Sequence, residues 1–294
     1  MQIVSLTALS CGYHVPQGAA PTRRYRIHSR FRQALNLTRG DGDLLTLLDS
    51  RYGNTPAAIR VAAPLGWDWR SRTADGLAVL LQDGALHADG WRLALGRAVR
   101  WEPPPFTPRE RPPPAALYKA LTADLRRYVN EHGLHSALQL LPDWPTGGRV
   151  ITLAVDDEPP RLQAQVERLI GYGTGLTPDG DDFLLGYLAV LRPWSHLDAI
   201  AGHFELLKQS ITGQLKATTD ISRHYLNMAL QGHLSEPLSR LIAAISSSAN
   251  DVEIHHAALS VMRTGSASGV DSLSGVIHGI AALQAALSVN IETL

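Results

Sequence analysis

The sequence predicts an α+β protein with a small, mostly β N-terminal part and a larger helical C-terminal part. Two observations favour this class: short apolar runs separated by Gly and Asp turns come first, and longer segments with apolar residues at i, i+3 and i+4 follow. The change falls within the proline-rich stretch 101–117 (WEPPPFTPRERPPPAAL). Because proline donates no hydrogen bond to a β-ladder and interrupts helices, this stretch indicates a linker or a domain boundary. We therefore predict a mostly β domain at 1–105 and a mostly helical domain at 106–294.

The expected strands and helices follow these periodicities. Short apolar runs typical of strands occupy residues 42–50, 57–63, 76–90 and 91–96. Within 76–90, Asp83 and Gly84 separate two apolar runs, which predicts a hairpin with a two-residue turn. Helical spacing, commonly ending at Gly or Pro, predicts helices within the segments 115–133, 161–171, 183–194, 200–215, 222–234, 237–247, 252–265 and 273–287.

Composition excludes several functional classes. Lys+Arg and Asp+Glu both number 27, and the basic residues are neither clustered nor interleaved with aromatic ones, so we expect no nucleic-acid partner. Cys11 is the only cysteine, which excludes an internal disulfide and a metal centre built from cysteines. The N-terminus lacks the features of a signal peptide, and no apolar run approaches the ~20 residues that cross a bilayer. We therefore expect a soluble, cytoplasmic protein with no membrane partner.

The most unusual segment is 171–182 (GYGTGLTPDGDD), which directly precedes the apolar run FLLGYLAVL. The segment 265–283 repeats its pattern, [DS]-G-x-D-x-L-x-G, without a gap. The alignment places Gly180, Asp182, Leu184 and Gly186 on Gly269, Asp271, Leu273 and Gly275. In each copy an N-cap candidate, Asp179 or Ser268, stands three residues before the repeated aspartate, as in a capping box. We expect an apolar helix after each copy, with the second pair of glycines at a tight helix contact.

Two interpretations of these segments remain open. In the first, the residues only cap two helices. In the second, backbone N–H groups at one or both helix starts hold a small anionic ligand, and the glycine-rich approach is longer than a cap alone requires. The glycine spacing fits neither a Walker A loop nor a G-x-G-x-x-G fingerprint. The candidate ligand-binding residues are Gly173, Thr174, Gly175, Thr177, Asp179, Gly180, Ser266, Ser268 and Gly269, with Thr218 and Thr219 from another expected helix start.

The aspartates also leave a metal site open. Asp179, Asp181 and Asp182 are oxygen ligands of the kind that hold Mg²⁺ against a bound phosphate. Aspartates that are simply solvated in the first helical turn are the alternative. If the two glycine-rich segments form one site, their helices must begin side by side, about one helix-packing distance of ~8–10 Å apart.

Several segments carry a resemblance to a known family. Residues 173–188 (GTGLTPDGDDFLLGYL) resemble the signature G-x-G-L-T-P-x-G-D-D-F-L-x-G, and 266–275 (SASGVDSLSG) resemble S-G-x-D-x-L-x-G. Residues 218–238 resemble T-x-x-S-x-x-x-L-x-x-A-x-x-G-x-x-S-E, and 27–37 and 52–61 resemble weaker N-terminal blocks. These are motifs of the AllH family, which contains a subunit of oxamate carbamoyltransferase in anaerobic allantoin degradation.

The resemblance implies a carbamoyltransferase subunit that acts with other protein subunits on carbamoyl phosphate or a related small anion in purine or allantoin catabolism. Such a transfer requires a phosphate site and donors for the developing oxyanion. The candidate catalytic residues are Asp181, Asp182 and Asp271, and the first two would position an amine or a metal. The S-T-R-T-R loop of ornithine- and aspartate-type carbamoyltransferases is absent, so we expect a different fold and site. The alternative is a non-catalytic scaffold or regulatory protein that binds a small anion or a partner subunit.

Overall fold

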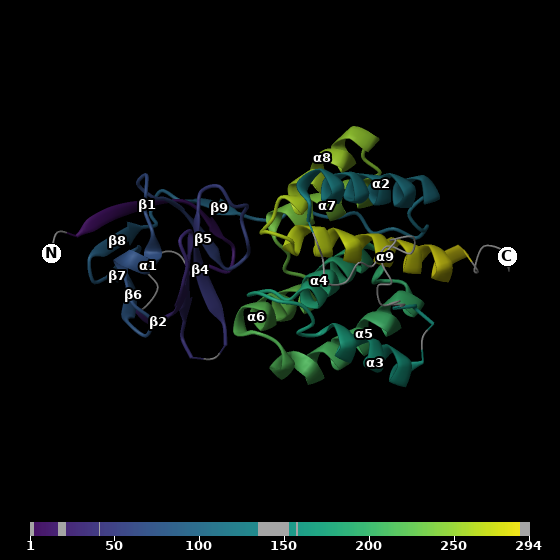
Figure 1. Ribbon diagram of the computed structural model, residues 1–294, viewed down its shortest axis with the longest axis horizontal. Coiled ribbons are helices and arrows are strands. Elements are labelled where there is room, and N and C mark those ends of the chain that lie inside the picture. Colours follow the sequence, from purple (N-terminus) through teal and green to yellow (C-terminus); the bar gives the residue numbers. More distant parts are fainter. Residues whose placement is uncertain (1–2, 17–21, 41, 135–152, 157, 289–294) are drawn as a thin grey trace. The chain divides into compact units, whose positions relative to one another are not determined.

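The chain divides into two compact units, Met1–Pro103 and Pro104–Leu294. The computed structural model describes residues 3–16, 22–40, 42–134, 153–156 and 158–288 (Figure 1). In the described residues, the first unit consists of strands with one short helix, and the regular elements of the second are helices. The predicted α+β class is therefore confirmed.

The first unit is a closed, strongly curved sheet. Its elements are β1 (Val4–Gly12), β2 (Arg23–Arg30), β3 (Ala34–Thr38), β4 (Leu44–Asp49), β5 (Ala58–Ala62), α1 (Trp69–Arg72), β6 (Ala78–Gln82), β7 (Ala85–Ala88), β8 (Trp91–Ala94) and β9 (Val99–Trp101). The strand order is β5-β4-β3-β2-β6-β7-β8-β1-β9. Because β1 also pairs antiparallel with β5, eight strands close into a barrel. The first part of β1 pairs with β8, and its last residues, from Ser10 to Gly12, pair with β9.

Alternation of side chains fills the barrel. Along β2, Tyr25 and Ile27 are buried while the arginines between and before them are exposed. The predicted hairpin is confirmed: β6 and β7 are joined by Asp83 and Gly84, whose φ values of 50° and 66° are those of a primed two-residue turn. Cys11 is fully buried in this core, and its burial raises the pKa of the thiol to about 11, so it is no candidate nucleophile.

The second unit is a helical domain. Its helices are α2 (Ala115–His132), α3 (Pro159–Leu169), α4 (Asp179–Leu191), α5 (Asp198–Gln214), α6 (Asp220–Leu230), α7 (Glu236–Ser247), α8 (Asp251–Met262) and α9 (Ser268–Ser288), with the short turns η1 (Arg192–Trp194) and η2 (Leu215–Ala217). Part of the proline-rich stretch packs on this domain. Arg109 N donates to Pro193 O (2.9 Å), and Arg111 O accepts from Trp194 Nε1 (2.8 Å). The stretch that the sequence marks as a linker or boundary is therefore attached to the helices over these residues.

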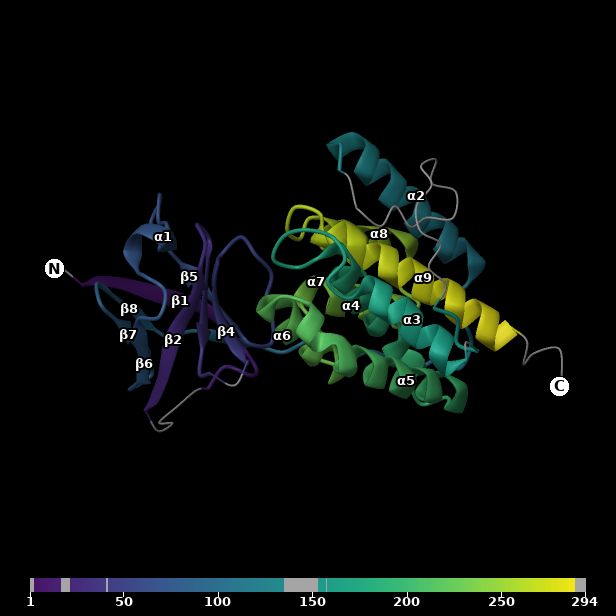
Figure 2. The same ribbon diagram turned by 60° about the horizontal axis from the view of Figure 1, so that its bottom comes forward.

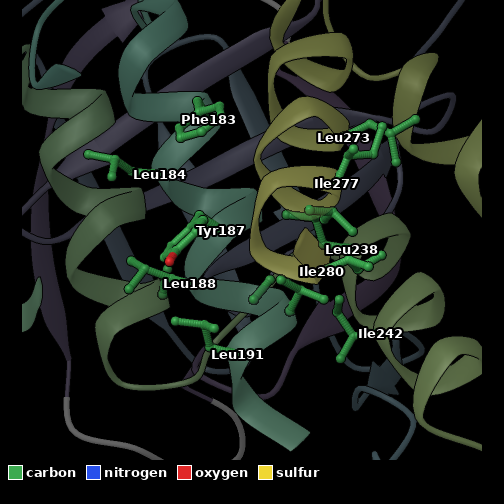
Figure 3. Packing of buried hydrophobic residues seen from close by; sticks show 14 of the residues in the cluster. Phe183, Leu184, Tyr187, Leu188, Leu191, Leu238, Ile242, Leu273, Ile277 and Ile280 are labelled. Carbon is green, nitrogen blue, oxygen red and sulfur yellow. The ribbon is translucent and has the colours of Figure 1, made fainter. Parts of the chain in front are cut away.

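Helices α4 and α9 lie side by side at the centre of the helical domain (Figures 1 and 2). Their apolar side chains meet one another and those of α7 (Figure 3). A Cβ at Gly186 would overlap Ser272 O, and a Cβ at Gly275 would overlap Phe183 O, so glycine lets the two backbones touch. The predicted burial of the helix after Asp182 and the tight contact at Gly186 are confirmed.

The interior of α4 contains one polar connection. Tyr187 is fully buried, and its hydroxyl donates to Leu153 O and accepts a hydrogen bond of 2.9 Å from His203 Nε2. Among the described residues, α9 is the one helix long and apolar enough to cross a membrane, but it is mostly buried in the protein. Its apolar character is explained by its central position in this core.

Candidate functional site

The two repeated segments meet in the structure. Besides the reciprocal glycine contacts of α4 and α9, Thr177 Oγ1 and Ser268 Oγ share a hydrogen bond of 2.9 Å. Both helices therefore begin at the same end of the domain, as the sequence predicts for a shared site (Figure 2).

The predicted N-caps are wrong. Helix α4 begins at Asp179 and α9 begins at Ser268, so each of these residues is the first of its helix. The Pro178 carbonyl accepts from Asp181 N (2.9 Å) and Asp182 N (3.1 Å), and no side chain caps α4. The capping box does not form because the side chain of Asp182 is directed to other partners.

The first glycine of each copy packs against the preceding helix. A Cβ at Gly180 would overlap Leu169 O at the end of α3, and a Cβ at Gly269 would overlap Val261 O near the end of α8. Gly180 N already donates to Tyr172 O (2.9 Å). Gly269 N likewise donates to Thr264 O (3.0 Å). These two glycines serve close packing, and their N–H groups are occupied within the chain.

The exposed part of the site consists of two loops. The loop before α4 turns at three glycines in the left-handed region, Gly171, Gly173 and Gly175, with φ values of 70°, 113° and 94°. Thr174 and Gly175 are exposed at its tip, and Ser266 is exposed in the loop before α9. A Cβ at Gly173 would meet the main chain and the carboxyl group of Asp179, so the loop folds back over the start of α4.

Asp181 is held by three donors. Its side chain accepts from Gly171 N (3.0 Å), from Thr218 Oγ1 and from Ser222 Oγ (2.7 Å). Burial raises the pKa of Asp181, and these three hydrogen bonds oppose the rise because they stabilise the charged form. The carboxyl group thus joins the loop before α4 to the start of α6.

A second contact joins the same elements. Thr219 is the N-cap of α6 and accepts from Ser222 N (3.0 Å). Its hydroxyl also donates to Leu176 O (2.6 Å) in the exposed loop. Thr218 and Thr219 therefore lie against the loop that contains Thr174 and Thr177, as a common site requires.

Asp182 is placed differently from its neighbour. It is 4% exposed, and its carboxyl group forms hydrogen bonds with the hydroxyls of Thr177 and Ser268. Among the described residues, none gives its Oδ2 a hydrogen bond. Burial raises the pKa of Asp182 well above its ordinary range; the nearby carboxylates of Asp271 and Asp181 raise it further, against the two hydroxyl hydrogen bonds. Asp182 therefore keeps its proton to higher pH than an ordinary aspartate.

Family comparison covers both units. The model of the AllH family, described as oxamate carbamoyltransferase subunit AllH, matches residues 169–280, and the model of the AllH family N-terminal domain matches residues 7–100. The chain belongs to the AllH family. The longer match spans both glycine-rich loops and the starts of α4, α6 and α9. No solved structure matches this AllH-family chain.

In the described part of this AllH-family chain, Asp179, Asp181 and Asp182 do not form a metal site. Within the described ranges, no three His, Cys, Asp or Glu side chains are close enough to hold an ion together. Asp181 already accepts three hydrogen bonds from the chain, whereas Asp182 lies beside Asp271. The geometry therefore gives no support to an Mg²⁺ ion held by Asp179, Asp181 and Asp182.

Sequence reasoning missed one member of this AllH-family site. Ser222 lies in the first turn of α6 and donates to Asp181, and Thr218, which precedes the N-cap Thr219, donates to the same carboxyl group. The available signal was the T-x-x-S pattern of Thr219 and Ser222, which places a second hydroxyl at an expected helix start. The position of α6 beside the loop before α4 cannot be predicted from the sequence, because it is set by tertiary packing.

Proposed function

We propose that this AllH-family chain is a cytoplasmic subunit of an oxamate carbamoyltransferase-like enzyme in purine or allantoin catabolism, and that it binds carbamoyl phosphate or a related small anion. The proposed site is formed by residues 174–177 and 266–268, of which 174–176 and Ser266 are exposed and Ser268 is the first residue of α9. The observation that carries it is Asp182, a buried carboxyl group with one oxygen lacking a hydrogen bond from any described residue, directly behind the Thr177–Ser268 contact between these loops. Burying such a group costs free energy, and perturbed carboxyls of this kind concentrate at functional sites.

The chemistry of a carbamoyl group matches these groups. It presents N–H donors and a carbonyl acceptor, and a carboxyl group that holds its proton offers a complementary donor and acceptor. The exposed hydroxyls of Thr174 and Ser266 are donors for phosphate oxygens. The N–H groups of Gly180 and Gly269 are occupied, so positive charge for the anion has to come from other groups, such as the exposed Arg263 beside the second loop or a residue of another subunit. The family description as a subunit supports such an assembly.

A non-catalytic scaffold or regulatory role is the second candidate. It is favoured by the glycine contacts, because Gly180, Gly186, Gly269 and Gly275 are all explained by packing without a ligand. In that case the loops bind a small anion or a partner subunit, and no carbamoyl group is transferred.

Thermal melting tests the anion site. Inorganic phosphate or carbamoyl phosphate at ~100 times its dissociation constant is expected to stabilise the protein by roughly 2.7 kcal/mol. Thr174→Val and Ser266→Ala should weaken this shift, whereas Thr212→Val, an exposed threonine on α5, should leave it unchanged. Parallel scans with Mg²⁺ and with EDTA test whether a metal accompanies the ligand. No shift with either ligand, or equal shifts in all variants, would remove the anion site.

Activity separates the two candidate functions. Carbamoyl-transfer assays of this chain with and without candidate partner subunits should show turnover only in the assembled enzyme. Asp182→Asn in that assembly should reduce turnover while the subunits still associate. An assembly that binds phosphate but turns over equally well with Asp182→Asn would favour the scaffold role.

A further inference from the structure

We propose that Asp181 is a positioning residue: it fixes the conformation of the loop 171–178 and so sets the geometry with which that loop binds its ligand. This inference rests on the proposed function. It differs from the role of a catalytic residue that the sequence suggests for Asp181.

Both carboxyl oxygens of Asp181 are bound within the chain, whereas Oδ2 of Asp182 accepts no hydrogen bond from a described residue. Asp181 is 0% exposed, and its carboxyl oxygens accept from the main chain at Gly171 and from the side chains of Thr218 and Ser222. Gly171 is near the beginning of the loop before α4, and Thr218 and Ser222 lie at the start of α6. A catalytic residue has to reach the reacting atoms, and this carboxyl group instead reaches the two ends of a connection within the chain.

The second copy of the repeated motif supports this assignment. The gap-free alignment places Val270 at the position of Asp181, and Val270 is 3% exposed in the apolar core. In both copies the first glycine packs on the preceding helix and the second glycine packs on the helix of the other copy. An acid at this position is therefore not needed to build the helix start.

The two copies differ in the connection that precedes the helix. Residues 170–178 join α3 to α4, whereas the shorter segment 263–267 joins α8 to α9. The longer loop contains three glycines with positive φ, and glycine gives a loop conformational freedom that has to be restrained on folding. Asp181 restrains this loop at Gly171, and Thr219 restrains it again at Leu176 O. The exposed tip, Thr174 and Gly175, lies between the two restraints.

Asp181 also occupies a place that an external anion would otherwise take. Without the carboxylate, Gly171 N and the hydroxyls of Thr218 and Ser222 would be donors open to an anion beside the start of α6. With Asp181 there, the inner side of the loop is filled by the chain's own acid. A phosphate or carbamoyl phosphate is thereby confined to the outer side, at Thr174 and Ser266.

Hydrogen–deuterium exchange tests the positioning role without any ligand. In Asp181→Ala, amide exchange in peptides covering 171–178 and 218–222 should accelerate by on the order of 10-fold or more, while peptides from the middle of α9 stay protected. Asp181→Asn keeps an oxygen acceptor for Gly171 N, and the hydroxyls of Thr218 and Ser222 can rotate to accept from its amide. It should therefore restore most of the protection.

Graded variants keep the test valid if Asp181→Ala does not fold. Ser222→Ala removes one donor and should accelerate exchange in the loop by a smaller factor. Ser210→Ala is the matched control, because that hydroxyl donates only to Leu206 O within α5 (2.9 Å) and should leave the loop unchanged.

Kinetics of the assembled enzyme complete the test. Asp181→Ala should lower kcat/KM for carbamoyl phosphate by on the order of 100-fold through misplacement of the loop. Asp181→Asn should stay within about threefold of the natural enzyme. Unchanged loop exchange in Asp181→Ala overturns the inference, and so does an Asp181→Asn enzyme that keeps loop protection but loses turnover. Because exchange needs no ligand, these outcomes are separate from a failure of phosphate binding.

Discussion

The starts of α4 and α9 are two versions of one motif. Gly186 of α4 touches Ser272 of α9, and Gly275 of α9 touches Phe183, which the alignment places at the position of Ser272. The contacts are thus exchanged between the two copies, as around a local two-fold axis. At one aligned position the copies differ in kind: Asp181 is bound by three donors, and Val270 is packed among apolar side chains.

This comparison separates packing from ligand binding. Residues that both copies share with the same contacts, above all the glycines, explain how two helices come together without a ligand. Residues found in one copy only belong to the longer loop and its connection to α6. Asp182 and Asp271 are an exception, because both copies have them and yet their burial side by side opposes folding. A shared feature that destabilises the domain needs a reason other than packing.

The largest expected effect concerns the shared glycines. Gly275→Ala or Gly186→Ala places a Cβ onto a carbonyl oxygen of the facing helix, so the helices have to separate. We expect a loss of about 4–5 kcal/mol of unfolding free energy, or no folded helical domain. Gly202→Ala on α5 has open space around it and should instead stabilise by about 0.5–1 kcal/mol. Chemical denaturation measures both, and similar effects at Gly275 and Gly202 would contradict the reciprocal packing.

The sequence predicts the fold class because its periodicities are clear over long segments. It does not predict β2, since RRYRIHSR presents arginines outward and only Tyr25 and Ile27 mark its buried face. The closure of the barrel cannot be predicted from the sequence either. It depends on the pairing of β1 with β5, whose register shifts between Ala8 and Ser10, and local composition does not encode such a pairing.

The site was predictable where the signal is repetition. The aligned copies predict that α4 and α9 begin together, and Gly186 and Gly275 predict the tight contact. The roles of individual side chains were not predictable, because Asp181 could be a cap, a metal ligand or a catalytic acid by sequence alone. Its partners Thr218 and Ser222 reach it only through the packing of α6 on α4.

A second prediction concerns Val270, the residue of the second copy that is aligned with Asp181. Val270→Asp puts a carboxyl group into the second copy, where the aligned residue is surrounded by the apolar core. Without dedicated donors, a buried charge should destabilise the domain by about 3 kcal/mol at neutral pH. Val270→Asn has the same size without the charge, so its loss should be smaller, and the gap between the two variants should narrow in acid as the aspartate is protonated. Equal losses at every pH would show that charge is not what distinguishes the two copies.

The smallest expected effect concerns the carboxyl group that both copies share. Because the pKa of Asp182 is raised in the folded protein from its ordinary value of 3.8, the folded state holds a proton that the unfolded state has already lost. Unfolding free energy therefore falls as pH rises from that value through the folded pKa, and it stays low above. Asp182→Asn removes this decrease of unfolding free energy with pH. The asparagine keeps a side-chain oxygen as acceptor for the hydroxyls of Thr177 or Ser268, and its amide can donate to Asp271.

We expect Asp182→Asn to stabilise the domain by on the order of 1 kcal/mol at neutral pH and to flatten the dependence of stability on pH. That gain corresponds to about 2–4 °C in melting temperature for a domain of this size. Scans between about pH 5 and 8 avoid the opposite titration of Asp68, whose ion pair with Arg70 lowers its pKa to about 2. Under the proposed function the same variant loses carbamoyl transfer, so a gain in stability accompanies a loss of activity, as is expected where a functional group is kept at a cost to folding. A variant that is less stable than the natural protein across this range would mean that Asp182 is ionised and bound in the fold, and the carboxyl pair would then be a structural contact like that of Asp181.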